Sequence, residues 1–186
     1  MFIQTEETPN PATLKFLPGQ VILKSGSMDF RTVEDAADAP LAKRLFTLQG
    51  VRSVFFGGDF VSVTKEDDTD WVMLKSMVLA SLMEHLSMGM PIVNDNALDQ
   101  NKDDGENDSE IVQQIKELLE TRVRPAVAMD GGDIVFDRFE DGIVFLQMQG
   151  ACAGCPSSTA TLKVGIENML KHFIPEVEEV RPVDYF

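Results

Sequence analysis

The chain has 186 residues, of which 44% are hydrophobic, and its 31 acidic and 16 basic side chains give a formal net charge of −15. This length and apolar content are enough for one large or two small domains that fold around buried cores. The negative charge repels phosphate backbones and anionic lipid surfaces, so we expect no nucleic acid and no membrane among the partners.

The N-terminus and the longest apolar stretch argue against export and membrane insertion. The first seven residues contain no basic side chain and no apolar run of signal-peptide length. Residues 71–90 are interrupted by Lys75, Glu84 and His85, whereas a membrane span needs about 20 apolar residues. We therefore expect an intracellular protein, cytoplasmic in a bacterium or located in the mitochondrial matrix if the chain is the mature form of a eukaryotic protein.

Residues 94–110 divide the sequence. This stretch is mostly acidic and polar, with too few apolar side chains to offset the entropy lost on ordering, and repulsion among its carboxylates favours an extended chain. We predict an α+β or α/β fold class with two small domains, 1–92 and 109–186, joined by a flexible acidic linker at 93–108. A long solvated loop inside one domain is the alternative.

The first domain carries strand and helix signals but no chemical motif. Thr8-Pro9-Asn10-Pro11 imposes an extended entry, because proline disfavours helical backbone in the residue before it. We expect, in chain order, a strand over 13–17, a helix over 40–46, a hairpin of strands 51–56 and 60–64, and a helix over 70–88. We assign this domain no chemistry, and we assign His85 a structural or solvated role.

The second domain is predicted to have the order α-β-β-α-β. Its first helix is expected to end near Pro125, because proline cannot continue a regular helix. The expected elements are a helix over 108–123, a hairpin of strands 133–139 and 143–148, a helix over 156–173, and a strand over 177–183.

Cys152 and Cys155 lie at the junction between the second hairpin strand and the last helix, and they are the candidate metal ligands. The glycine and alanine residues around them leave room for a bulky inorganic cofactor and for amide hydrogen bonds to its sulfurs. Pro156 suits the first turn of the helix, which places Cys155 just outside a helix N-terminus. The positive end of the helix dipole there favours thiolate, the form that binds metal.

The number of ligands predicts the stoichiometry. Tetrahedral zinc and cubane iron–sulfur clusters take about four ligands, and one chain supplies two thiols. His172 lies about 25 Å along the same helix, and His85 belongs to the other domain, so neither completes the site. A second copy of the chain would complete the site and give four thiolates for a [4Fe–4S] cluster. A [2Fe–2S] cluster or zinc is also chemically permissible. We expect such a shared cluster to be exposed and transferable.

Other interpretations of the motif stay open. A dithiol redox pair also sits at a helix N-terminus, although the antiparallel hairpin before the motif disfavours the βαβ context expected for it. A dimer built around structural zinc is a further alternative, and packing alone is a weaker one. Asp130 and Asp133 beside Gly131-Gly132 are not assigned a metal, because a turn lined by carboxylates is usually just solvated.

Several segments resemble a known family. In the second domain these are residues 121–127, Asp130-Gly131-Gly132-Asp133-Ile134, and the run 149–158 that contains both cysteines; they closely resemble the NifU-like C-terminal domain of the Nfu family. Residues 8–11, 14–19 and 50–65 resemble the N-terminal domain of that family. Only the linker and the extreme termini fall outside the resemblance, and the cysteine positions show no departure from the family pattern.

The resemblance implies a function beyond what the spacing indicates. Nfu proteins assemble or carry a [4Fe–4S] cluster bridged between subunits and are not ordinary enzymes. By resemblance, Cys152 and Cys155 are the ligands, and the partners are a second copy, the assembly machinery as donor, and apo-proteins such as lipoyl synthase, aconitase and respiratory-complex subunits. The N-terminal domain is implied to assist target recognition or cluster release.

Overall fold

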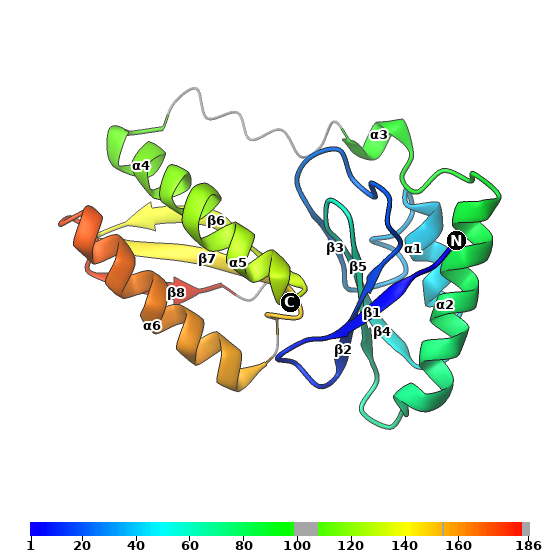
Figure 1. Ribbon diagram of the computed structural model, residues 1–186. Coiled ribbons are helices and arrows are strands. Elements are labelled where there is room, and N and C mark those ends of the chain that lie inside the picture. Colours follow the sequence, from blue (N-terminus) through cyan, green and yellow to red (C-terminus); the bar gives the residue numbers. More distant parts are fainter. Residues whose placement is uncertain (99–107, 154, 184–186) are drawn as a thin grey trace. The chain divides into compact units, whose positions relative to one another are not determined.

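The computed structural model describes residues 1–98, 108–153 and 155–183. The chain divides into two compact units, Met1–Lys102 and Asp103–Phe186, each of which is described by itself. Both combine helices with a sheet (Figure 1), as the predicted mixed fold class requires. Among the described residues, no helix has both the length and the apolar character needed to cross a membrane.

Unit 1 is an antiparallel five-stranded sheet with the order β1-β2-β5-β4-β3. Its strands are β1 (Gln4–Glu7), β2 (Thr13–Leu17), β3 (Met28–Phe30), β4 (Val51–Phe56) and β5 (Val61–Lys65). The predicted strand over 13–17 and the predicted hairpin are confirmed. The two edge strands β1 and β3 were not predicted, because they are short and lack a clear apolar alternation.

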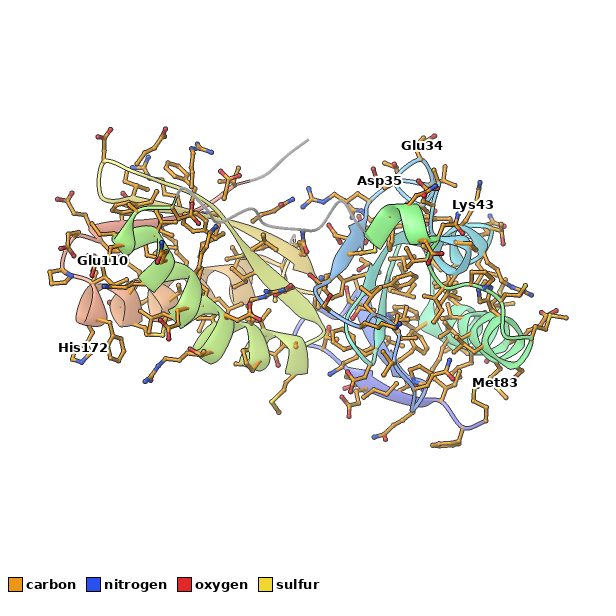
Figure 2. All side chains as sticks on the ribbon, turned by 90° about the horizontal axis from the view of Figure 1, so that it is seen from above. Glu34, Asp35, Lys43, Met83, Glu110 and His172 are labelled. Carbon is orange, nitrogen blue, oxygen red and sulfur yellow. The ribbon has the colours of Figure 1, made fainter. Side chains whose placement is uncertain are left out.

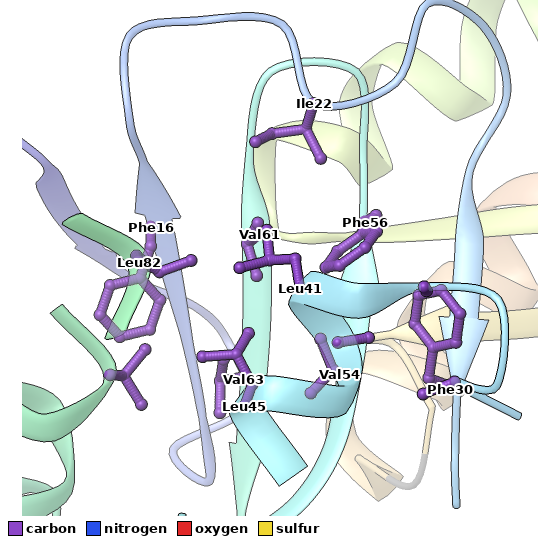
Figure 3. Packing of buried hydrophobic residues seen from close by; sticks show 14 of the residues in the cluster. Phe16, Ile22, Phe30, Leu41, Leu45, Val54, Phe56, Val61, Val63 and Leu82 are labelled. Carbon is purple, nitrogen blue, oxygen red and sulfur yellow. The ribbon is translucent and has the colours of Figure 1, made fainter. Parts of the chain in front are cut away.

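Two helices, α1 (Pro40–Phe46) and α2 (Trp71–Ser87), cover one face of this sheet. Lys43 on α1 and Met83 on α2 point away from the sheet (Figure 2). The inward face of α2 consists of Leu74, Val78, Leu82 and Leu86, all buried. These side chains complete the core with the apolar residues of the central strands (Figure 3).

The end of unit 1 differs from the flexible linker predicted over 93–108. Asp95–Leu98 form a short helix, α3, with Ala97 buried. The Asn94 N–H donates to the Asp38 carbonyl oxygen at 2.8 Å, so this end of the segment is attached to unit 1 by hydrogen bonding and packing. The remainder of the predicted linker, 99–107, lies outside the described residues.

Unit 2 has the predicted order α-β-β-α-β. Its helical first part consists of α4 (Glu110–Leu118), a π-helical turn η3 (Leu119–Val123) and α5 (Arg124–Met129). A three-stranded sheet of β6 (Gly132–Glu140), β7 (Ile143–Gly150) and β8 (Glu179–Pro182) has the order β6-β7-β8, with β8 parallel to β7. The last helix, α6 (Pro156–Phe173), connects β7 to β8.

The expectation that the first helix of unit 2 ends near Pro125 is wrong. Pro125 has no N–H, and in a regular α-helix its ring would clash with the carbonyl of the residue four positions earlier. The π-helical turn η3 removes this conflict by widening the helix before the proline. The helical chain therefore continues to Met129, directly before the turn that leads into β6.

Candidate metal centre

Cys152 and Cys155 lie between β7 and α6, as predicted. Cys152 is in the turn after Gly150, and Cys155 is the N-cap residue of α6, with extended backbone angles of φ −97° and ψ 104°. Both are thiols and both are buried. In the isolated chain Cys152 packs into the apolar core of unit 2; the exposure expected for a shared cluster stays a prediction.

Backbone hydrogen bonds hold the cysteine loop in place. Gly150 has a φ of +64°, which few other residues tolerate, and it turns the chain out of β7. The Ala151 N–H then donates to the Gly131 carbonyl at 3.2 Å, and the Thr159 hydroxyl donates to the Cys152 carbonyl at 3.2 Å. Sequence analysis missed Thr159, whose hydroxyl connects the loop to the first turns of α6.

Gly132 makes room for the thiol of Cys152. A Cβ atom at position 132 would lie 2.8 Å from the Cys152 Sγ and 2.6 Å from the Gln149 carbonyl oxygen. Both distances are too short for atoms that are not bonded, so only glycine fits without movement. The Gly131-Gly132 pair was visible in the sequence as a turn signal, but its contact with the cysteine was not.

The surroundings of Cys152 favour the neutral thiol. Burial, followed by the negative charges of Asp130 and Asp133 and the neighbouring Cys155, raises its pKa to about 12. The thiolate expected at the helix N-terminus concerned Cys155 and stays a prediction for that residue; at Cys152, loss of solvent and two nearby carboxylates act in the opposite direction.

Asp133 is buried and is held by an arginine. Arg124 donates to its two carboxylate oxygens, and the Ile134 N–H donates to Oδ1 at 2.8 Å. Arg124 also pairs with Glu120. The carboxylates of Asp133 and Glu120 together raise the pKa of Arg124 above its ordinary value. The sequence suggested a solvated turn residue, but Asp133 is part of a buried ion pair.

The two histidines do not join the cysteines. His172 is exposed near the end of α6, where it contacts Phe173 edge-on, and its side chain projects from the outer end of that helix (Figure 2). His85 belongs to unit 1, where it is buried and its Nε2 lies 2.9 Å from the Pro91 carbonyl oxygen. Across the described parts of the chain, no three His, Cys, Asp or Glu residues are grouped to hold a metal ion.

Comparison with known proteins covers both units. Residues 3–89 match the family model described as scaffold protein Nfu/NifU N terminal, and residues 115–181 match the NifU-like domain. A human protein named NFU1 iron-sulfur cluster scaffold homolog, mitochondrial, is 51% identical over 184 residues, which is 98% of this chain and 72% of that protein. The chain belongs to the Nfu/NifU scaffold protein family.

Other Nfu/NifU relatives agree with this assignment. NifU-like protein 4, mitochondrial, from Arabidopsis thaliana is 54% identical over 97% of this chain and 65% of its own length. The Drosophila ananassae protein named NFU1 iron-sulfur cluster scaffold homolog, mitochondrial, is 50% identical over 98% of this chain and 64% of its own length. The chain thus spans slightly less than two thirds of these last two relatives.

Proposed function

We propose that this Nfu/NifU family member is an iron–sulfur cluster scaffold or carrier and not an enzyme. Two copies would hold one [4Fe–4S] cluster through Cys152 and Cys155 of each copy, with a [2Fe–2S] cluster as the alternative cargo. The observation that carries the proposal is the position of both thiols in one short loop between β7 and α6, inside the region that matches the NifU-like domain. Relatives named iron-sulfur cluster scaffold homologs support the same assignment.

Sharing between two copies follows from the supply of ligands. The described residues of one chain bring two thiols together and group no third His, Cys, Asp or Glu with them. A cluster that takes four protein ligands then needs two more thiolates, and a second copy of the same loop is the simplest source. The homodimer would therefore form with the cluster.

The burial of the thiols bears on how the cargo would be loaded and released. Because burial and nearby carboxylates raise the pKa of Cys152, loading would have to remove its proton, and binding to iron would favour the thiolate. Release would run in the reverse direction: thiolates of an acceptor replace Cys152 and Cys155 at the iron, and each cysteine takes a proton and returns to its buried position. Such a cycle favours transfer over long-term storage.

The electrostatics disfavour the dithiol redox alternative. Redox cysteines at helix N-termini have lowered thiol pKa values, because the thiolate is the attacking species. Cys152 has a raised pKa of about 12, which would leave little thiolate at neutral pH. A dimer around structural zinc needs the same four thiols, and metal analysis of the purified protein separates it from the carrier.

The names of the relatives bear on location and partners. The human, plant and fly relatives carry the word mitochondrial in their names, which supports the mitochondrial matrix over the bacterial cytoplasm that we also considered. For partners we propose the iron–sulfur assembly machinery as donor and apo-proteins that require a cluster as acceptors.

Anaerobic reconstitution with iron and sulfide tests the function. We expect about two irons and two sulfides per chain, broad absorption near 400 nm characteristic of thiolate-bound iron, and the mass of a dimer on the same sample. Cys152→Ser and Cys155→Ser should each abolish cluster binding, whereas Val164→Ser, at an exposed site on α6, should not. A colourless monomer, or full iron content in either cysteine variant, would refute the proposal.

A further inference from the structure

Helix α2 exposes apolar side chains on the side that faces away from the sheet of unit 1. Val72 is 78% exposed, Met73 74%, Met77 40% and Met83 41%. Met73, Met77, Ala80 and Met83 follow one another at spacings of three or four residues, which places them on one helix face. Ala80 is exposed as well, and Met83 points away from the sheet (Figure 2). We call these five residues the methionine face of α2.

The methionine face is unusual for a helix at the surface of a protein, which normally turns charged and polar side chains to solvent. Helix α4 follows the usual pattern, since its exposed residues are Glu110, Gln113, Gln114 and Glu117. Among the exposed residues of the described helix α2, only Lys75 and Glu84 carry a charge, and Glu84 is ion-paired with Arg44 on α1. The inner face of α2 is apolar too. A helix that is apolar on both sides is typical of one that is covered on both sides.

The segment that leads into α2 is acidic. Residues 66–70 read Glu-Asp-Asp-Thr-Asp, and all four acidic residues are exposed. The Asp67 side chain is 92% exposed, and its Oδ1 lies 3.9 Å from Nη1 of Arg52, a contact too long and too wet to neutralise it. These carboxylates border the end of the methionine face at which Val72 and Met73 lie. A partner that covers this face therefore gains from basic side chains next to its apolar ones.

We propose that the methionine face docks an amphipathic helix of a partner protein, whose apolar side covers Met73, Met77 and Met83 and whose basic side chains lie beside residues 66–70. Side chains of one helix pack into the grooves between side chains of another, and the small Ala80 leaves room for such a side chain. Methionine is flexible and polarisable, so this surface can repack against partners of different shape. A second copy of the chain fits less well, because it carries the same net charge of −15 and the same acidic segment.

The inference goes beyond the proposed function and does not depend on the cysteines. A carrier that serves several acceptors gains from an adaptable docking surface, but docking at α2 needs no cluster. The measurements below therefore use the full chain without iron and sulfide. Failure of cluster binding and failure of docking are then separate results.

The first test measures the binding of a fluorescein-labelled peptide of leucine and lysine, patterned as an amphipathic helix, by fluorescence anisotropy. We expect the wild type to bind this peptide. The double variant Met73→Ser, Met77→Ser should bind it about tenfold more weakly, as the loss of an interface anchor does. Met129→Ser is the matched control and should bind as the wild type, because Met129 is equally exposed, at 76%, but lies outside the methionine face.

The acidic segment is tested with the same peptide. The double variant Asp67→Asn, Asp68→Asn should bind about twofold to fivefold more weakly at low salt, and the difference should shrink as the salt concentration rises. The control variant Glu110→Gln, Glu117→Gln removes two exposed carboxylates from α4 and should bind as the wild type. A peptide with glutamate in place of every lysine should not bind.

A second measurement locates the peptide on the wild-type chain. With carbon-13 labels on the methionine methyl groups, the signals of Met73, Met77 and Met83 should shift when the leucine and lysine peptide is added. The signal of Met129 should stay in place. Circular dichroism checks the fold of each variant, and should the methionine double variant fail to fold, the methyl shifts of the wild type decide.

Four results would overturn the inference. The first is a wild type that does not bind the leucine and lysine peptide, or that binds the glutamate peptide equally well. The second is wild-type affinity in the folded variant Met73→Ser, Met77→Ser. The third is a set of methyl shifts that leaves out the methionine face. The fourth is a dimer of the iron-free chain in sedimentation that this double variant abolishes, because a second copy would then be what covers α2.

Discussion

Substituting Gly132 by alanine should destabilise unit 2 through a collision at the cysteine. The new Cβ atom would lie 2.6 Å from the Gln149 carbonyl oxygen, 2.8 Å from the Cys152 Sγ and 3.1 Å from the Cys152 backbone nitrogen. Two of these atoms belong to the backbone, so a rotamer change cannot relieve the overlap. Overpacking of this kind costs about 1–3 kcal/mol. Replacing glycine returns about 0.4–1 kcal/mol by restricting the unfolded chain, which leaves a net loss of roughly 1–2 kcal/mol.

Urea unfolding monitored by circular dichroism measures this loss. With a slope of about 1–3 kcal/mol per molar urea, the midpoint of unit 2 should fall by roughly 1 M. The chain has one tryptophan, Trp71 in α2, so its fluorescence reports unit 1 and should keep its midpoint.

Gly165→Ala is the matched control for Gly132→Ala. Position 165 is exposed in α6, and a Cβ atom there would have no neighbour within 4 Å. Alanine should therefore stabilise the helix by about 0.5–1 kcal/mol. If Gly132→Ala is as stable as the wild type, or shifts in the same direction as Gly165→Ala, the reasoning from the contact with Cys152 is refuted.

Three further predictions concern single contacts. Because the pKa of Cys152 is raised from 9.0 to about 12, its alkylation rate should still rise with pH above 9. The folded state holds this proton more tightly than the unfolded state, so the contribution of the Cys152 thiol to folding stability is complete below pH 9 and is lost as the pH rises towards 12. A plateau in the alkylation rate near pH 9 would contradict the raised pKa. Thr159→Val removes the hydrogen bond to the Cys152 carbonyl and should lower the free energy of urea unfolding by about 0.5–1.5 kcal/mol. It should also accelerate alkylation of Cys152. An unchanged alkylation rate would show that the hydroxyl does not hold the loop. His85→Phe removes the contact between the buried imidazole and the Pro91 carbonyl oxygen and should lower the unfolding free energy of unit 1, followed by Trp71 fluorescence, by about 1 kcal/mol. A shift confined to unit 2 would contradict the assignment.

The helices and hairpins could be predicted because their signals are local. The apolar spacing of Leu74, Val78 and Leu82 identifies α2 and its buried face, and turn residues mark both hairpins. The edge strand β1 carries no such pattern, since its polar residues become a strand only by pairing with β2. The continuation of the helix past Pro125 was also not readable, because proline ordinarily ends a helix and here a π-helical turn accommodates it.

The sequence by itself determined the position of the candidate site: two thiols separated by two residues, flanked by small residues and followed by a helix that starts at Pro156. Spacing along the chain settles this, because ligands so close together are neighbours in any fold. Only the tertiary structure decided the state of those thiols. Cys152 is buried by a core that several helices and strands of unit 2 build, and the close approach of Gly132 and the charge of Asp133 come from β6, about twenty residues earlier. Solvent exclusion and electrostatic fields depend on distance in space, so they arise only when packing brings these residues together.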